Sequence, residues 1–296
     1  MRSEESLATV LLVGRLASEG LLPLKASEYW TLRDQVGEVR TLLGRSERLL
    51  IEEHGLSPPF ARRVAGLLGR ATAVAFEVER LDQSGIATLT AFDEAYPRRL
   101  VDRLGPKAPP VLHAVGDVDL LAVPGLGVVG DVEPSAALGP VAAARGLPLV
   151  TGEFPTFDPT GIPVVWLLAD SLVHSLRRPD ARRAVYRGSI VACTPFGPDT
   201  PRGPGYARGR DRLVYGLSDV TLVLACDGER GDAWSGAIEA IDGGFGRVAV
   251  WRGPGEGPGN VALEARGATR VASIDALEAL LDGRDPAGRS APGPAD

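Results

Sequence analysis

Three arginines at alternate positions, Arg208, Arg210 and Arg212, could bind an anion at the start of a predicted helix. Apolar residues recur at helical spacing within 213–217, so the arginines precede a helical stretch that can face a core. A guanidinium group near a helix N-terminus can hold phosphate oxygens with its forked donors, while backbone N–H groups add further bonds. The alternative interpretation is a solvated basic face, because Asp211 stands among the arginines.

Glycine-containing segments beside predicted strands supply further candidate contacts to phosphate. Gly130 follows an apolar predicted strand, and parallel sheets commonly bind phosphate at a glycine turn between a strand and a helix. Ser235 and Gly236 end a loop after the apolar run 220–225, and this turn would offer backbone N–H donors. Trp234 beside them could stack on a base, with partial burial in the core as the alternative.

The sequence shows no arrangement expected of a catalytic or metal site. No Ser/His/Asp combination, carboxylate pair or Walker-type loop is visible, so we do not expect an enzyme. The three histidines are isolated, and no CxxC or HxxxH spacing occurs, so we expect no metal and no cofactor. The two cysteines, Cys193 and Cys226, cannot form a disulfide framework and are expected to be small buried hydrophobic residues.

From residue 86 onward the elements that must position these residues alternate between strand and helix. The helix–strand–loop–helix order over 210–241 predicts a mostly parallel sheet whose carboxyl edge would bind a ligand. A Pro- and Gly-rich stretch at 195–209 predicts a long surface loop. The predicted strands are 86–89, 111–115, 126–129, 147–151, 164–168, 190–193, 220–225 and 247–251, and helices are predicted at 135–145 and 237–241.

Residues 1–82 predict a small helical domain that precedes an α/β domain over 83–282. Ser27 and Ser57 are the predicted N-caps of two of its helices, the second with Pro58 in its first turn. Residues 283–296 are expected to be a disordered tail. The predicted helices cover 7–16, 27–36, 42–54, a segment that begins at 57–58 and runs through 68, and 73–81.

Charge is unevenly distributed along the 296 residues, although the net charge is −6. Residues 177–212 hold nine arginines against three aspartates, whereas 216–296 hold seven arginines against thirteen acids. Binding of nucleic acid requires a concentrated positive surface, not a positive total, so the acidity does not exclude it. No apolar run of about 18 residues lacks breakers, and the N-terminus differs from a secretory leader. We therefore expect a cytoplasmic chain that does not enter a membrane.

Several short motifs, in a consistent order, resemble the DNA-processing protein A family (DprA, also called Smf). The run RDRLVYGLS at 210–218 is similar to the family's RNRIIAGLS, so Arg210 and Arg212 match its two arginines. Ser235 and Gly236 stand where the family has an SG turn. Further matches are Asp93, Tyr96, Pro97 and Leu100 to "D..YP..L", 109–112 and 116–117 to "PPVLyvrGn", and 259–260 and 267–268 to "GN…GA".

The resemblance covers roughly residues 55–275 and implies an α/β fold with a Rossmann-like, mostly parallel sheet and an N-terminal SAM-like helical domain. One phosphate-binding motif of the family, VGSR, is altered here. Gly130 is kept, but Asp131 and Val132 stand in place of the serine and the phosphate-binding arginine. An Asp directed at a phosphate would repel it, and loss of the arginine removes roughly 1.5–3 kcal/mol of hydrogen bonding.

A second family motif, SGLAxGID, is altered at 151–158. Thr151, Gly152 and Asp158 fit the motif, whereas Thr156 replaces its second glycine, which permits close approach of the backbone to a ligand. The helix that should follow this motif is missing from the sequence pattern. The predicted phosphate or nucleic-acid contacts are Gly130, Gly152, Arg208, Arg210, Arg212, Ser235 and Gly236.

The resemblance implies a protein that binds single-stranded DNA and supports loading of a RecA-type recombinase during DNA uptake. The recombinase and a second copy of the chain are the protein partners it suggests. One alternative is a degenerate paralogue that acts as a scaffold without a ligand. Another is a nucleotide-binding protein or phosphoribohydrolase of the same superfamily, in which Glu239 would be the candidate acid. The N-terminal helical domain would either contact DNA or serve only for packing.

Overall fold

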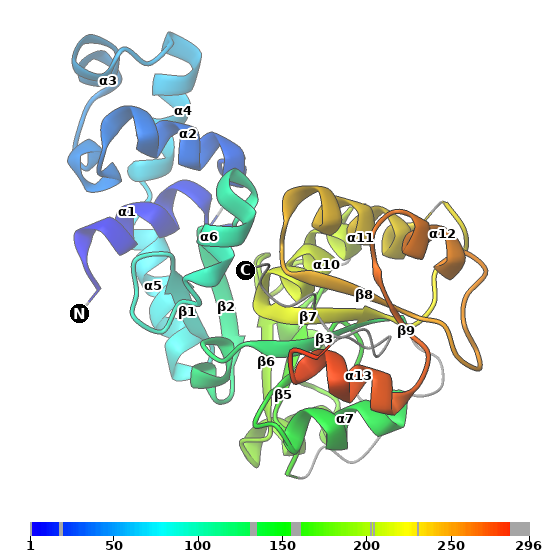
Figure 1. Cartoon of the computed structure of the whole chain (residues 1–296). Helices are drawn as coiled ribbons and strands as arrows, with labels where there is room; N and C mark the ends of the chain where they lie inside the picture. Colours follow the sequence, from blue (N-terminus) through cyan, green and yellow to red (C-terminus); the bar gives the residue numbers. More distant parts are fainter. Residues whose placement is uncertain are drawn as a thin grey trace, which may run out of the picture.

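The computed structural model describes residues 2–17, 20–130, 135–154, 161–201, 203, 205–229 and 231–284. Within these residues nine strands form one sheet in the order β1-β2-β6-β5-β4-β3-β7-β8-β9 (Figure 1). Strands β3 to β9 are all parallel to one another, while β2 pairs antiparallel with both β1 and β6. Their bounds are β1 Ala87–Thr90, β2 Val111–Val115, β3 Gly125–Val129, β4 Leu149–Thr151, β5 Val164–Leu167, β6 Ile190–Thr194, β7 Ser218–Val223, β8 Arg247–Trp251 and β9 Thr269–Val271.

Helices cover both faces of the sheet, as the apolar strands require. Every residue of β3, β5 and β6 is buried, which is the pattern of parallel strands packed on two sides. Helices α10 (Tyr206–Leu217), α11 (Asp232–Gly243) and α12 (Asn260–Ala265) lie over one face (Figure 1). Helices α7 (Ser135–Ala143) and α13 (Ile274–Leu281) lie over the other. The predicted α/β class with a mostly parallel sheet is confirmed.

The direction of the chain across the sheet reverses at β3. From β3 the chain passes through α7 to β4 on one side, and after β6 it returns through α10 to β7 on the other side of β3. Open α/β sheets bind ligands outside the carboxyl ends of their strands at such a reversal. Helix α10 packs on β3, β4, β5 and β7, so residues in its first turns reach this edge.

The N-terminal helices form a module that packs directly on the sheet. The indole Nε1 of Trp30 donates a 2.8 Å hydrogen bond to the carbonyl of Ala108, and Ser6 Oγ donates a 2.6 Å bond to Asp93. Buried side chains of the module and the sheet belong to one continuous hydrophobic core. The module's helices are α1 Glu4–Val13, α2 Ala26–Val36, η1 Val39–Leu42, α3 Glu47–His54, α4 Pro58–Leu68 and α5 Ala71–Gln83.

Short helices complete the connections between these parts. Within the described ranges, no helix combines the length and the apolar character needed to cross a membrane.

The connection between β4 and β5, which are parallel neighbours, has no helix in its described residues, 152–154 and 161–163. The short helices are α6 Arg99–Leu104, η2 Gly105–Lys107, η3 Val118–Leu121, α8 Leu172–Ser175 and α9 Pro179–Tyr186.

Two predictions about the N-terminal helices are wrong. Helix α2 begins one residue earlier than predicted, with Lys25 at the N-cap in place of Ser27. The carboxylate of Glu28 accepts a 2.7 Å bond from the backbone N–H of Lys25, which satisfies a donor at this helix start. The segment 42–54 is not one helix, because the chain turns at Gly44, which has a φ of 72°, between η1 and α3. The cap at Ser57 lacks a side-chain bond, but α4 begins at Pro58 as predicted.

Differences in the C-terminal half affect the predicted site. Helix α10 begins at Tyr206, within the predicted 195–209 loop, and continues through Gly216 to Leu217. A Cβ on Gly216 would lie 2.7 Å from Leu100, so glycine is needed there for packing against α6. Helix α11 begins at Asp232 instead of residue 237, and β9 was not predicted. Of the predicted tail, 285–296 lie outside the described residues.

Candidate nucleic-acid interface

Helix α10 separates the three predicted arginines onto two sides. Arg208 and Arg212 are one helical turn apart and share a face, whereas Arg210 lies between them in sequence and points away from both. The side chains of Arg208 and Arg212 are 50% and 25% exposed, whereas Arg210 is buried. The structure therefore brings two of the three arginines together.

Arg210 covers the predicted glycine at the end of β4. A Cβ on Gly152 would overlap the Arg210 guanidinium, so any other residue there would displace this side chain. Arg210 Nη1 lies 3.6 Å from a Glu153 carboxylate oxygen, and Nε lies 2.6 Å from Asp211 Oδ1. The Nε–H direction does not meet hydrogen-bond geometry, so this second contact is an ion pair and leaves the N–H without an acceptor in the described residues. Burial raises the pKa of Asp211, although the Arg210 charge opposes this.

Gly130 occupies the predicted turn at the end of β3. Its φ is 93°, and a Cβ there would lie 3.0 Å from the backbone nitrogen of Ala225, which follows β7. Both the positive φ and the short distance favour glycine. The turn after β3 and the segment after β7 thus approach closely at the carboxyl edge of the sheet, where the topology reverses. Asp131 and Val132 lie outside the described residues, as do Thr156 and Asp158 of the second altered motif.

Arg208 and Arg212 contribute to a group that we call the Glu239 cluster, made of Lys107, Arg208, Arg212 and Glu239. Arg212 binds the Glu239 carboxylate with two 3.0 Å hydrogen bonds, from Nε and Nη2. Lys107 Nζ donates a 2.7 Å bond to the same carboxylate, and Arg208 Nε lies 3.7 Å from it. Three cations thus share one carboxylate, which leaves the cluster with a net charge of +2.

The cluster keeps Glu239 ionised. Burial raises the pKa of this carboxyl, but the hydrogen bonds and charges of Arg212 and Lys107 outweigh burial and lower the pKa below its usual value. A carboxylate held in this way is a poor proton donor at neutral pH, so the geometry does not favour the acid role considered for Glu239. In the described part of the chain, no three His, Cys, Asp or Glu side chains are grouped to hold a metal ion.

Ser235 and Gly236 lie inside α11, not in the predicted loop. The backbone N–H of Ser235 donates to the carbonyl of Gly231 at 3.1 Å, so it is not available to a ligand. A Cβ on Gly236 would lie 3.3 Å from the Tyr215 ring, so this glycine allows α10 and α11 to approach. Ser235 does line a 620 Å³ hollow between these helices, together with the partly buried Trp234 and the Glu239 cluster.

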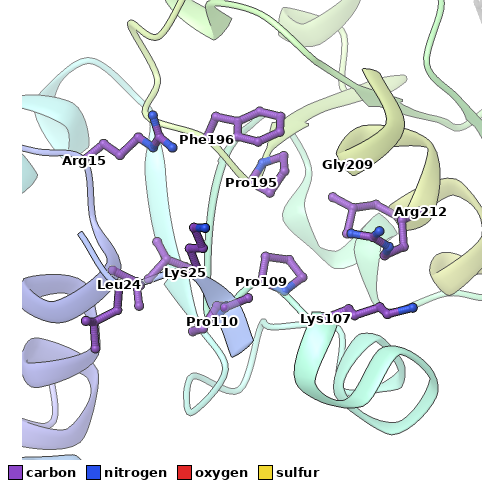
Figure 2. A pocket seen from close by; sticks show the side chains of 14 residues that line it. Arg15, Leu24, Lys25, Lys107, Pro109, Pro110, Pro195, Phe196, Gly209 and Arg212 are labelled. Atoms are coloured by element: carbon purple, nitrogen blue, oxygen red, sulfur yellow. The ribbon is translucent and has the colours of Figure 1, made fainter. Parts of the chain in front are cut away.

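Sequence reasoning missed Lys107, which lies 132 residues before its partner Glu239. It also missed Arg15 and Lys25 of the N-terminal module, which with Lys107 and Arg212 line a second pocket beside the hollow (Figure 2). The sequence carried one usable signal, since Lys25 and Lys107 are the only lysines in the chain. Nothing in the local pattern indicated that these two segments meet.

Comparisons with known proteins identify the fold. No protein-family model matches the chain, and no curated protein matches it. The X-ray structure of DNA processing protein A (DprA) from Streptococcus pneumoniae aligns with a TM-score of 0.56 at 19% identity, over 88% of this chain and 98% of that one. DNA processing protein A from Helicobacter pylori, whose structure gives insight into a unique single-stranded DNA binding mode, aligns with a TM-score of 0.54 at 22% identity, over 67% of this chain and 96% of that one. The chain therefore has a DprA-like fold with a divergent sequence, as the motif resemblance predicted.

Proposed function

We propose that this chain is a divergent DprA-type protein that binds single-stranded DNA in the hollow between α10 and α11. The observation that carries the proposal is the Glu239 cluster, in which three cations face one carboxylate beside Trp234. The DprA-like fold supports it, because the Helicobacter pylori protein with this fold binds single-stranded DNA. Fold alone does not imply function, so the argument depends on the charge and shape of the hollow, whose described lining holds three cations and two acids, Glu239 and Asp242, a net charge of +1.

The chemistry of the hollow suits a single strand. Lys107 and Arg208 are about half exposed, at 51% and 50% of their side chains, so their donors remain accessible to phosphate oxygens. Trp234 supplies an aromatic surface next to these cations, and stacking on aromatic side chains is how bases of single strands are commonly held. Binding would be driven largely by release of counterions, so it would weaken steeply with salt.

The wider role rests on the resemblance and is part of the same proposal. A protein of this type would act in the cytoplasm, pair with a second copy of itself and load a RecA-type recombinase onto incoming single-stranded DNA. The scaffold alternative makes the opposite prediction, since a degenerate paralogue would not bind an oligonucleotide. No described contact favours the phosphoribohydrolase alternative, because Glu239 is engaged with Arg212 and Lys107.

The proposal is tested by fluorescence anisotropy with a labelled oligothymidylate over a series of salt concentrations. Replacement of Arg208→Ala together with Arg212→Ala should raise Kd roughly 10-fold at low salt and reduce the slope of log K against log salt by about 1.4. The matched control is Arg48→Ala with Arg62→Ala, two exposed arginines of the N-terminal module that are each paired with a carboxylate. No binding by the unmodified chain at low salt would refute the proposal and favour the scaffold.

A further inference from the structure

A second pocket lies where the N-terminal module meets the sheet, and neither the motif resemblance nor the fold comparison assigns it a role. Its volume is 260 Å³. Figure 2 shows Arg15 and Lys25 of the module on one side of it, and Lys107 and Arg212 on the other. Because Lys107 and Arg212 also line the hollow between α10 and α11, the two spaces adjoin.

The pocket is positively charged. Four of its lining residues are cationic and none of the described lining residues is acidic, although two of the four, Lys107 and Arg212, pair with Glu239 in the adjoining hollow. Glu28, the acid nearest to Lys25 in sequence, pairs with Arg63 at 2.9 Å and also accepts the backbone N–H of Lys25, and the Lys25 charge contributes to its lowered pKa. Arg15 is held in place by a 2.9 Å hydrogen bond from Nη1 to the hydroxyl of Tyr206, a neutral partner, and no carboxylate of the described residues forms an ion pair with it. An anion entering this pocket would therefore meet cations from both parts of the chain.

The remaining wall is apolar and contains an aromatic ring. Phe196 lines the pocket and is stacked on Tyr206, with ring centroids 4.2 Å apart and planes 12° from parallel. A Cβ on Gly209 would lie 3.2 Å from Phe196 Cζ, so glycine at this point of α10 makes room for the ring. Pro109, Pro110 and Pro195 are further apolar residues that line the pocket (Figure 2).

We propose that this pocket takes one nucleotide unit of the bound single strand, an inference that rests on the proposed function. Its phosphate lies between Arg15 and Lys25, and its base lies against Phe196. The volume of 260 Å³ is slightly below the range for small-ligand sites, about 300–1,000 Å³, so it admits one such unit at most. The N-terminal module is then part of the DNA site and not only a packing domain.

The test uses the full chain, the same labelled oligothymidylate and two variants outside the Glu239 cluster. Arg15→Ala with Lys25→Ala should raise Kd roughly 5- to 10-fold at low salt and reduce the salt slope by about 1.4, because two phosphate contacts are lost. Phe196→Leu should raise Kd about 5-fold with an unchanged salt slope, since it removes stacking and no charge. A strand carrying 5-iodouracil should crosslink to a peptide that contains Phe196 or Tyr206.

The outcomes separate this inference from the proposed function. If the unmodified chain binds and the Arg208/Arg212 variant is weakened, but both new variants bind like the Arg48/Arg62 control, the pocket inference is overturned and the proposed function stands. Deoxythymidine monophosphate is the second probe. Loss of mononucleotide binding in the variants, with unchanged affinity for the oligonucleotide, would also overturn the inference, because the pocket would then serve free nucleotides. Circular dichroism confirms that each variant is folded.

Discussion

Glu239 is the acid that pairs with the cations lining the hollow between α10 and α11, where Asp242 is the second lining acid. Glu239 accepts two hydrogen bonds from Arg212 and one from Lys107, so it orients both cations while it cancels one positive charge. Salt bridges between exposed groups contribute little to stability, typically about 0–1 kcal/mol. Lys107 and Arg208 are half exposed, at 51% and 50%, so the main effect of Glu239 on these two is on where they lie and on the net charge of the cluster.

Replacement Glu239→Gln should strengthen binding of single-stranded DNA. The change removes one negative charge and raises the net charge of the cluster from +2 to +3, which is expected to lower Kd roughly 2- to 5-fold at low salt. The gain should disappear as salt screens the cluster. Anisotropy titrations measure it, with Glu53→Gln as the control, because Glu53 also pairs with an arginine, Arg45, in the N-terminal module. Unchanged or weaker binding would show that Glu239 does not limit access of phosphate.

At the scale of elements, the sequence predicts strands well and the ends of helices less well. The apolar runs that became β2 and β8 are bounded by turn residues, so both strands were predicted residue for residue. The start of α11 was missed because a Ser-Gly pair is typical of loops, whereas here the contact of Gly236 with Tyr215 permits a helix. β9 was missed because it has three residues, only one of them fully buried.

The residues of the candidate site also divide into those that local sequence predicts and those that it does not. The glycines Gly130 and Gly152 follow strands, and their special positions were predictable from local sequence. Arg208 and Arg212 face the same side only because both lie within α10. The start of this helix could not be predicted, because the sequence before Tyr206 is rich in glycine. Contacts such as that of Arg15 with Tyr206, 191 residues apart, depend on the tertiary fold and could not be predicted from a single sequence.

The pH dependence of stability is expected to report on His113 at the centre of β2. Burial, with a smaller effect of Arg2, lowers the pKa of His113 from 6.5 to about 4, so the folded chain keeps this imidazole neutral. The unfolded chain takes up the proton at higher pH. The resulting stability is therefore complete above pH 6.5 and is lost as the pH falls to 4, by about 3 kcal/mol.

Urea unfolding at a series of pH values measures this contribution. His113→Leu removes the titrating group, so its free energy of unfolding should fall less than that of the unmodified chain between pH 6.5 and 4. The variant also leaves Thr88 without its 3.2 Å contact to Nδ1, but that cost does not change with pH. Parallel curves for the two chains would show that His113 is protonated in the folded state as well.

At the scale of the whole molecule, the N-terminal module and the sheet share contacts that two independent domains would lack. Helix α1 packs on β1 and β2, and Arg2 Nη1 donates a 2.7 Å hydrogen bond to the carbonyl of Thr88 in β1. The predicted boundary at 82/83 falls at the end of α5, but the apolar core continues across it. The proposed nucleotide pocket needs this rigid contact, because its cations come from both parts.

Trp30→Phe should therefore destabilise the sheet as well as the module. The change removes the indole donor and leaves the buried carbonyl of Ala108 without its partner, at a cost of about 1–3 kcal/mol. The chain has four tryptophans, and the other three, Trp166, Trp234 and Trp251, lie in the sheet part, so their fluorescence reports on it alone in the variant. Their urea midpoint should fall with an unchanged m-value if the chain unfolds as one unit. Phe76→Ala, which truncates a side chain that is 73% exposed in the same module, should leave the midpoint in place. If the sheet tryptophans kept their midpoint in Trp30→Phe while circular dichroism showed an earlier loss of helix, the module would unfold separately, and it could not hold Arg15 and Lys25 against the sheet.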